Sequence, residues 1–322
     1  MIDLTELPAI SVPMPWQTQA WQQLHQQIQS DQLPHAILIA GMAETGKNRM
    51  AMALARLLLC HTPQAGHNCG NCHACQMSKV GSHGDFRWLE PEGKSRVIKV
   101  DQIREVVNFG TKTASLGQRK VIVFSPAENM NANAANALLK SLEEPARDTY
   151  LILVSHRLHG LPATIRSRCQ QMRLPPPTQT QSIDWLEQLT GNRQEGEQLL
   201  DLAVGRPMMA ETIYRAGDID AIRAIPAALE TLKTQRGSVP KVAALLGQLS
   251  IEDALAQCGV YLQRSISVAA ENSQMNQQSR KLFVLLDEVN RMQSALVSGA
   301  NPNPQLLLES LLARVQKNLG GS

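Results

Sequence analysis

Three short runs of consecutive apolar residues in the first half of the chain most constrain its fold. They span 35–41, 121–124 and 150–155, and they are continuous rather than alternating with polar residues. A strand that is apolar on both sides is buried on both sides, which is typical of parallel sheets covered by helices. Weaker strand candidates lie near 86–90 and 170–174. We therefore expect a parallel sheet in this half of the chain.

Helical patterns separate these strand candidates. They cover about 46–60, 101–112 and 131–144, and Pro145 ends the last one because proline cannot continue the hydrogen bonding of a helix. Strands that alternate with helices favour an α/β fold in which helices connect parallel strands. The fold class expected for residues 1–173 is therefore α/β with a parallel sheet.

The second half of the chain is expected to be helical throughout. Three consecutive prolines at 175–177 indicate an extended linker after the sheet. The pattern then predicts a small helical domain over 174–216 and a larger one over 217–322. The helices expected in these two domains cover about 178–190, 194–204, 207–216, 218–235, 239–247, 250–270, 275–298 and 304–318.

Composition limits the class of protein before any motif is considered. A chain of 322 residues is long enough for two or three domains, and its apolar residues, 43% of the total, form no run of membrane-spanning length. The first fifteen residues are acidic and contain prolines, unlike a secretory signal peptide, so we expect a cytoplasmic protein without a membrane partner. A net charge of +3 neither requires nor excludes nucleic acid as a direct ligand.

Four of the six cysteines lie close together in the sequence, at Cys60, Cys69, Cys72 and Cys75. Thiols of cytoplasmic proteins stay reduced, so this spacing predicts a metal site rather than disulfides. Four thiolates suit a closed tetrahedral Zn²⁺ site with no open position for catalysis. The zinc is therefore expected to hold together an inserted module at about 60–80.

Two alternatives remain for this cluster. One of the neighbouring histidines, His61, His67 or His73, could replace a cysteine as ligand, or the thiols could be reduced and unligated. Cys169 and Cys258 lie outside the cluster, and we expect them to pack as small buried apolar groups.

The segment from Gly41 to Asn48 follows the first expected strand and opens a helix, with the spacing of a phosphate-binding P-loop. Gly41, Gly46 and Lys47 are the candidate nucleotide-binding residues. Asn48, however, occupies the position where a Ser or Thr hydroxyl normally binds Mg²⁺. The segment is either a degenerate site that retains some nucleotide or phosphate binding, or a glycine turn that binds nothing.

Acidic residues that would hold Mg²⁺ are also missing after the strand at 121–124. Ser125 and Pro126 follow that strand directly, and Glu128 lies further along. Without these groups the site lacks much of the charge stabilisation on which phosphoryl transfer depends. We expect no ATP hydrolysis at this site, and ATP binding by the chain is doubtful.

Two further segments carry a resemblance to a known family. The block 136–145 reads Asn-Ala-Leu-Leu-Lys-Ser-Leu-Glu-Glu-Pro, and the triplet Ser167, Arg168 and Cys169 follows it. Together with the P-loop-like turn and the cysteine cluster, these segments resemble the AAA+ clamp-loader subunits of bacterial DNA polymerase III. The resemblance implies an AAA+ core followed by a helical lid and a helical collar through which the subunits assemble.

In that family the arginine of the Ser-Arg-Cys triplet reaches the ATP of a neighbouring subunit. The resemblance therefore implies that Arg168 is an arginine finger that acts in trans, the one catalytic role expected for this chain. Arginine suits this role because its charge is permanent and its planar fork can contact two phosphate oxygens. The alternative is that Arg168 makes an ordinary surface salt bridge.

Within that family the chain resembles the delta-prime type. The hydrolysing gamma and tau types share the cysteine cluster, but they keep the Ser or Thr and the acidic residues that this chain lacks. The resemblance implies a non-hydrolysing component of the polymerase holoenzyme that helps load the beta sliding clamp onto primed DNA during replication. The implied partners are gamma or tau and delta subunits, the beta sliding clamp and, through the assembled complex, primed DNA.

Two other function classes remain open. An active clamp-loader ATPase would require Asn48 and Glu128 to rebuild the metal site. A zinc-dependent nucleic-acid-binding module would use the fold without nucleotide.

One more difference separates the chain from the hydrolysing subunits, in which an arginine three residues after a glycine touches the subunit's own nucleotide. Here Arg206 follows Gly205 directly.

Overall fold

The chain folds into two compact units, residues 1–185 and 186–322. The computed structural model describes residues 7–93, 95–217, 219–234, 236–271, 277–297, 300 and 302–319. The first unit contains a β-sheet, and the second consists of helices. Among the described residues, none of the helices combines the length and the apolar character needed to cross a membrane.

Five parallel strands form the sheet of the first unit, in the order β2-β3-β4-β1-β5. Their bounds are Ala36–Ala40 (β1), Phe86–Leu89 (β2), Lys120–Phe124 (β3), Thr149–Ser155 (β4) and Gln170–Arg173 (β5). The three strong strand predictions and the two weaker ones are confirmed. Because all strands run in the same direction, their carboxyl ends share one edge of the sheet and their amino ends share the other.

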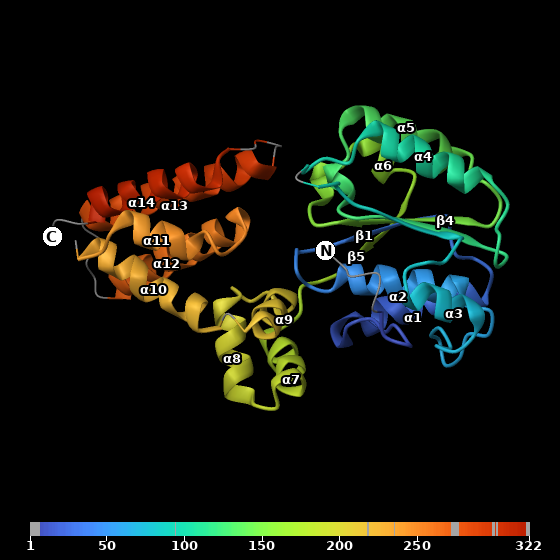
Figure 1. The fold of residues 1–322 in the computed structure, drawn as a ribbon, viewed down its shortest axis with the longest axis horizontal. Coiled ribbons are helices and arrows are strands. Elements are labelled where there is room, and N and C mark those ends of the chain that lie inside the picture. The colour runs from blue at the N-terminus through green and yellow to red at the C-terminus, as the bar shows by residue number, and fades with distance from the viewer. Residues whose placement is uncertain are drawn as a thin grey trace. The chain divides into compact units, whose positions relative to one another are not determined.

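Helices cover both faces of this sheet. Figure 1 shows α4, α5 and α6 on one face and α1, α2 and α3 on the other. The predicted helices at 46–60, 101–112 and 131–144 are confirmed, and their bounds agree with α2, α4 and α5 to within one residue. The helical bounds are Pro15–Gln17 (η1), Thr18–Gln29 (α1), Lys47–Leu59 (α2), His73–Lys79 (α3), Val100–Thr111 (α4), Ala127–Asn129 (η2), Ala132–Glu143 (α5), Leu158–Gly160 (η3) and Ala163–Arg166 (α6).

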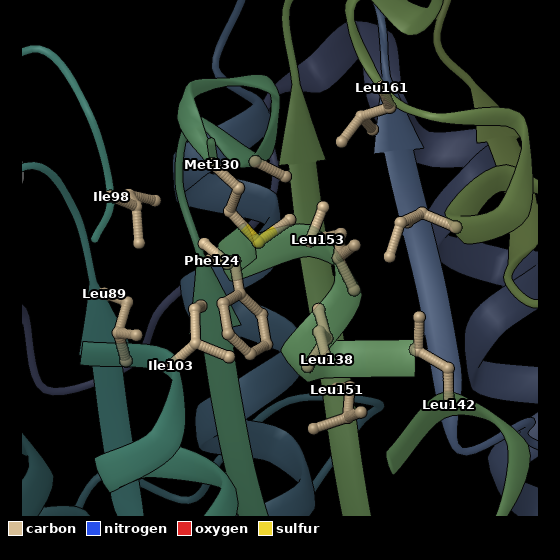
Figure 2. Close-up of a cluster of buried hydrophobic side chains, with 14 of the residues drawn as sticks. Leu89, Ile98, Ile103, Phe124, Met130, Leu138, Leu142, Leu151, Leu153 and Leu161 are labelled. Carbon is tan, nitrogen blue, oxygen red and sulfur yellow. The ribbon is translucent and has the colours of Figure 1, made fainter. Parts of the chain in front are cut away.

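The two faces of each central strand belong to two different hydrophobic cores. In β1, Leu38 packs in the core beneath α4 and α5, whereas Ile37 and Ile39 pack in the core beneath α2. Figure 2 shows the first of these cores, to which Phe124 of β3 and Leu138 of α5 both belong. Successive side chains of a strand point to opposite faces, so a strand covered on both sides must be apolar at every position. This requirement explains the continuous apolar runs of the sequence.

The second unit is built from helices that bury leucine, isoleucine and valine side chains. Their bounds are Arg193–Leu202 (α8), Pro207–Ala216 (α9), Ile219–Lys233 (α10), Val239–Leu246 (α11), Ile251–Glu271 (α12), Gln277–Val297 (α13) and Pro304–Leu319 (α14), and α7 (Gln179–Thr190) spans the division between the units. Every helix predicted after the proline run is present, although residues 218, 235, 275–276 and 298 of the predicted ranges lie outside the described residues. The separate domains at 174–216 and 217–322 stay a prediction.

Shortening a core side chain is expected to destabilise the first unit. Leu138→Ala should lower its free energy of unfolding by about 2–5 kcal/mol, because Leu138 is fully buried and its loss leaves a cavity. The exposed Lys140 lies in the same helix, and Lys140→Ala should change that free energy by less than about 0.5 kcal/mol. Denaturant unfolding followed by tryptophan fluorescence measures both, since all four tryptophans lie in this unit. Equal effects of the two substitutions would contradict this assignment of the core.

Candidate functional site

The four predicted cysteines come together between α2 and α3, with all four sulfur atoms within 4.8 Å of one another. Cys60 Sγ lies 3.9 Å from Cys72 Sγ and 3.6 Å from Cys75 Sγ, and Cys69 Sγ lies 3.9 Å from Cys75 Sγ. Four thiolates held about 2.3 Å from a Zn²⁺ ion form a tetrahedron with edges of about 3.8 Å. The cluster therefore has the dimensions of a four-thiolate zinc site.

Hydrogen-bond donors surround these sulfur atoms. The backbone N–H of Cys69 donates to Cys60 Sγ at 3.2 Å, and that of Cys72 donates to Cys69 Sγ at 3.4 Å. The side-chain amide of Asn68 donates to Cys75 Sγ at 3.4 Å. Donors of this kind stabilise the negative charge of thiolates and orient them as metal ligands. These surroundings are compatible with thiolates that bind a metal ion.

The neighbouring histidines are not needed for this donor set, because cysteine sulfur atoms fill all four corners. His67 instead stacks on Trp21, with ring centroids 5.4 Å apart and ring planes 9° apart. Cys169 and Cys258 are buried elsewhere, and burial raises the pKa of each thiol to about 12. Both cysteines therefore pack as small neutral groups.

A buried arginine that the sequence analysis did not identify connects the cysteine module to the N-terminal segment, residues 8–17. Arg56 lies in α2 and is only 2% exposed. Its guanidinium donates to Ser78 Oγ at 3.0 Å and to the Cys75 carbonyl oxygen at 3.3 Å on the module side. It also donates to Ser11 Oγ at 2.8 Å and to the Ala9 carbonyl oxygen at 3.1 Å. The available signal was a single cation in the apolar stretch 50–59 of α2, since buried charge requires polar partners.

The N-terminal segment continues from the cysteine module to the P-loop-like turn. Near the module, the Ser11 N–H donates to Asn68 Oδ1 at 2.8 Å. Further along, Trp16 Nε1 and the side-chain amide of Gln17 donate to the Thr45 carbonyl oxygen at 3.0 Å and 3.2 Å. The segment thereby contacts both the cysteine module and the turn between β1 and α2.

The P-loop-like turn is closed by contacts within the chain itself. Gly46 has a φ of +86°, and a Cβ at this position would lie 2.3 Å from Met14 Cγ of the N-terminal segment. Lys47 begins α2, is only 2% exposed, and donates a hydrogen bond to the Met42 carbonyl oxygen of the same turn. Desolvation by burial lowers the pKa of Lys47 to about 8. The lysine that would contact phosphates is therefore buried and bound to its own loop.

Side chains on the metal side of the turn bind one another. The hydroxyl of Ser125, directly after β3, donates to Asn48 Oδ1 at 2.6 Å. The Glu128 side chain is 2% exposed and accepts a hydrogen bond from the His156 backbone N–H at 2.9 Å. Burial, followed by the positive charge of Lys47, lowers the pKa of His156 to about 3, so its imidazole is neutral. Asn48 and Glu128 thus already have partners within the protein.

Two other residues singled out in the sequence have packing or ionic contacts. Gly41 lies at the end of β1, where a Cβ would come within 2.8 Å of the Leu174 carbonyl oxygen, so close packing is one reason for this glycine. In the helical unit, Arg206 donates to Asp253 Oδ1 at 3.3 Å and to the Ala203 carbonyl oxygen at 3.2 Å. Arg206 is therefore engaged within its own unit.

Arg168 lies at the amino edge of the sheet, two residues before β5. Its Nε donates to Glu143 Oε1 at 2.7 Å, and its NH1 donates to the Thr164 carbonyl oxygen at 2.9 Å. The P-loop-like turn follows β1 at the opposite edge, and β1 and β5 are parallel neighbours. A five-residue strand is about 17 Å long, so roughly this distance separates Arg168 from the turn. Arg168 is therefore out of reach of a phosphate bound at its own turn.

Sequence comparisons find related proteins, one of them over nearly the whole chain. Residues 16–178, half of the chain, match a family model described as DNA polymerase III, delta subunit. DNA polymerase III subunit delta' of Pseudomonas aeruginosa is 45% identical over 205 residues, which are 63% of this chain and 62% of that protein. Subunit delta' of Escherichia coli is 30% identical over 320 residues, which are 95% of this chain and 96% of that protein.

A solved structure has the same fold. It is a DNA polymerase III gamma subunit-related protein from Thermotoga maritima, with a TM-score of 0.53 and 22% sequence identity, covering 93% of this chain and 99% of that one. The parallel sheet, the cysteine cluster and the helical second unit agree with the AAA+ clamp-loader architecture expected from the sequence. The motif resemblance, the fold and the near full-length similarity to the Escherichia coli protein lead to one conclusion: the chain belongs to the DNA polymerase III subunit delta' family.

Proposed function

We propose that this chain is a non-hydrolysing clamp-loader subunit that completes the ATP site of a neighbouring subunit with Arg168. The observation that carries this proposal is the location of Arg168 at the amino edge of the sheet, opposite the chain's own P-loop-like turn. Its side chain is 34% exposed, so a neighbouring chain can reach it. Membership of the delta' family supports a role in loading the beta sliding clamp onto primed DNA.

The contacts at the P-loop-like turn support the absence of hydrolysis. Lys47 is bound to the Met42 carbonyl and Asn48 to the Ser125 hydroxyl. Phosphoryl transfer relies on Mg²⁺ to neutralise charge that develops on the phosphates, and the chain lacks the usual ligands for that ion. An active ATPase would require these contacts to break, so that Asn48 and Glu128 could face a metal ion.

The cysteine cluster is proposed to hold one structural Zn²⁺ ion. Cys60, Cys69, Cys72 and Cys75 supply four thiolates, which leave no open position for a substrate or a reactive water. Metal binding by such a set contributes to folding directly. Through Arg56, the bound ion would also stabilise the N-terminal segment that closes the P-loop-like turn.

The partners that fit this role are the other subunits of a clamp loader. We propose that the chain assembles with gamma or tau and delta subunits in the cytoplasm. The complex would act on the beta sliding clamp and would contact primed DNA as an assembly. The helical second unit is the proposed site of assembly, in agreement with the collar expected from the motif resemblance.

The purified chain is expected to contain about one zinc ion. Cys72→Ser should abolish most of the zinc content and lower the thermal stability of the first unit, because three thiolates hold the ion less tightly than four. Cys258→Ala is the matched control, since Cys258 is buried outside the cluster, and it should retain the zinc. Elemental analysis measures both variants. Zinc-free wild-type protein, prepared in the presence of zinc, would rule out the site.

The purified chain is also expected to hydrolyse no ATP above the level of Lys47→Ala. The reason is that the side chains around the turn bind one another instead of a metal ion. Phosphate release measured with and without Mg²⁺ provides the test. Robust magnesium-dependent release that is lost in Lys47→Ala would reassign the chain as an active ATPase.

Arg168→Ala is expected to leave assembly of the complex nearly unchanged and to lower its ATP hydrolysis in the presence of clamp and primed DNA. An arginine finger is worth about 10³ to 10⁵ in rate at a single site, but other sites in the complex would dilute the loss. Arg168→Lys should be intermediate, because lysine keeps the charge and loses the planar two-point contact. Mutant complexes that hydrolyse ATP at the unmodified rate would leave Arg168 a structural residue.

A further inference from the structure

The guanidinium of Arg168 is already oriented in the isolated chain. Glu143 is the last residue of α5, and its Oε1 accepts a hydrogen bond from Arg168 Nε at 2.7 Å. The same oxygen lies 2.5 Å from Arg168 NH2. One carboxylate oxygen of Glu143 therefore binds both Nε and NH2 of the Arg168 guanidinium.

The other terminal nitrogen of Arg168 is bound by the residues just before it in the chain. NH1 donates to the Thr164 carbonyl oxygen at 2.9 Å and to Ser167 Oγ at 3.4 Å. Thr164 belongs to α6, a helix of four residues, and carbonyl groups at a helix end lack partners within the helix. Contacts on two sides of the fork fix both the position and the plane of the guanidinium.

This arrangement matters more for orientation than for stability. Glu143 and Arg168 have side-chain exposures of 49% and 34%, and ion pairs this exposed contribute little to the stability of a fold. A free arginine side chain, in contrast, samples many rotamers and loses that freedom when it binds phosphate. A guanidinium that is already fixed loses less side-chain entropy when it binds its ligand.

We propose that Glu143 is a positioning residue that holds Arg168 in the orientation required to contact the ATP of a neighbouring subunit. The inference rests on the proposed function of Arg168 and extends it to a second residue that does not itself touch the nucleotide. It also gives a physical role to the block 136–145: α5 runs toward the amino edge of the sheet, so its last residue arrives beside the triplet that contains Arg168.

Three variants of the assembled complex test this role. Glu143→Ala should lower the kcat of clamp- and DNA-stimulated ATP hydrolysis at least about twofold and leave KM for ATP unchanged, because the finger acts in the transition state. Glu143→Gln should retain more activity, since its amide oxygen can still accept the hydrogen bond from Nε. Glu144→Ala is the matched control, because Glu144 is the exposed neighbour in sequence while Glu143 is the acidic partner of Arg168, and it should keep the unmodified rate.

A double mutant separates positioning from general damage to the fold. In complexes that already carry Arg168→Ala, adding Glu143→Ala should cause no further loss. A further loss of the same size in that background would assign Glu143 a structural role and overturn the proposal. A rise in kcat for Glu143→Ala would mean that the carboxylate restrains the finger, which also overturns it.

The same series distinguishes failure of this inference from failure of the proposed function. If Arg168→Ala lowers hydrolysis but Glu143→Ala does not, Arg168 still acts in trans and Glu143 does not position it. If neither substitution changes hydrolysis, the finger role itself is wrong and the positioning role fails with it. Zinc content and thermal unfolding of each variant confirm that the first unit remains folded.

Discussion

The common direction of the five strands is the constraint on which the functional arrangement depends. Parallel pairing sends the P-loop-like turn, Ser125 and His156 to the carboxyl edge of the sheet, where β1, β3 and β4 end. The same pairing leaves Arg168, which precedes β5, at the amino edge. A strand length separates the two sites. Arg168 and the P-loop-like turn therefore lie at opposite edges of the sheet.

Contacts of the N-terminal segment connect the cysteine module to the P-loop-like turn. Arg56 binds the cysteine module and the N-terminal segment with one buried guanidinium, and the segment then packs Met14 on Gly46. A buried cation needs this full set of acceptors, since an unpaired charge in the interior is costly. The cysteine module and the closed turn are therefore both held by contacts with the N-terminal segment.

Local patterns in the sequence were sufficient to predict the five strands, the longer helices that follow them and the cysteine cluster, but not the short helices α3 and α6. Continuous apolar runs indicate strands that are buried on both faces. Cys69, Cys72 and Cys75 are close in the sequence, so their proximity in space could be predicted without knowing the tertiary fold. The contact of Arg168 with Glu143 could not be predicted from the sequence, because 25 residues separate them and only the tertiary fold brings them together. The N-terminal segment was missed for a similar reason: it lacks periodicity, and its role depends on distant partners.

The central claim is that catalysis by this subunit occurs at a neighbour's nucleotide and not at its own. A structure of the assembled clamp loader with a transition-state analogue of ATP tests this claim most directly. The account predicts Arg168 within hydrogen-bonding distance of the phosphates bound to the adjacent subunit, with Lys47 still bound to the Met42 carbonyl. A structure in which Arg168 faces solvent, or in which Lys47 and a metal ion hold the analogue at this chain's own turn, would contradict it.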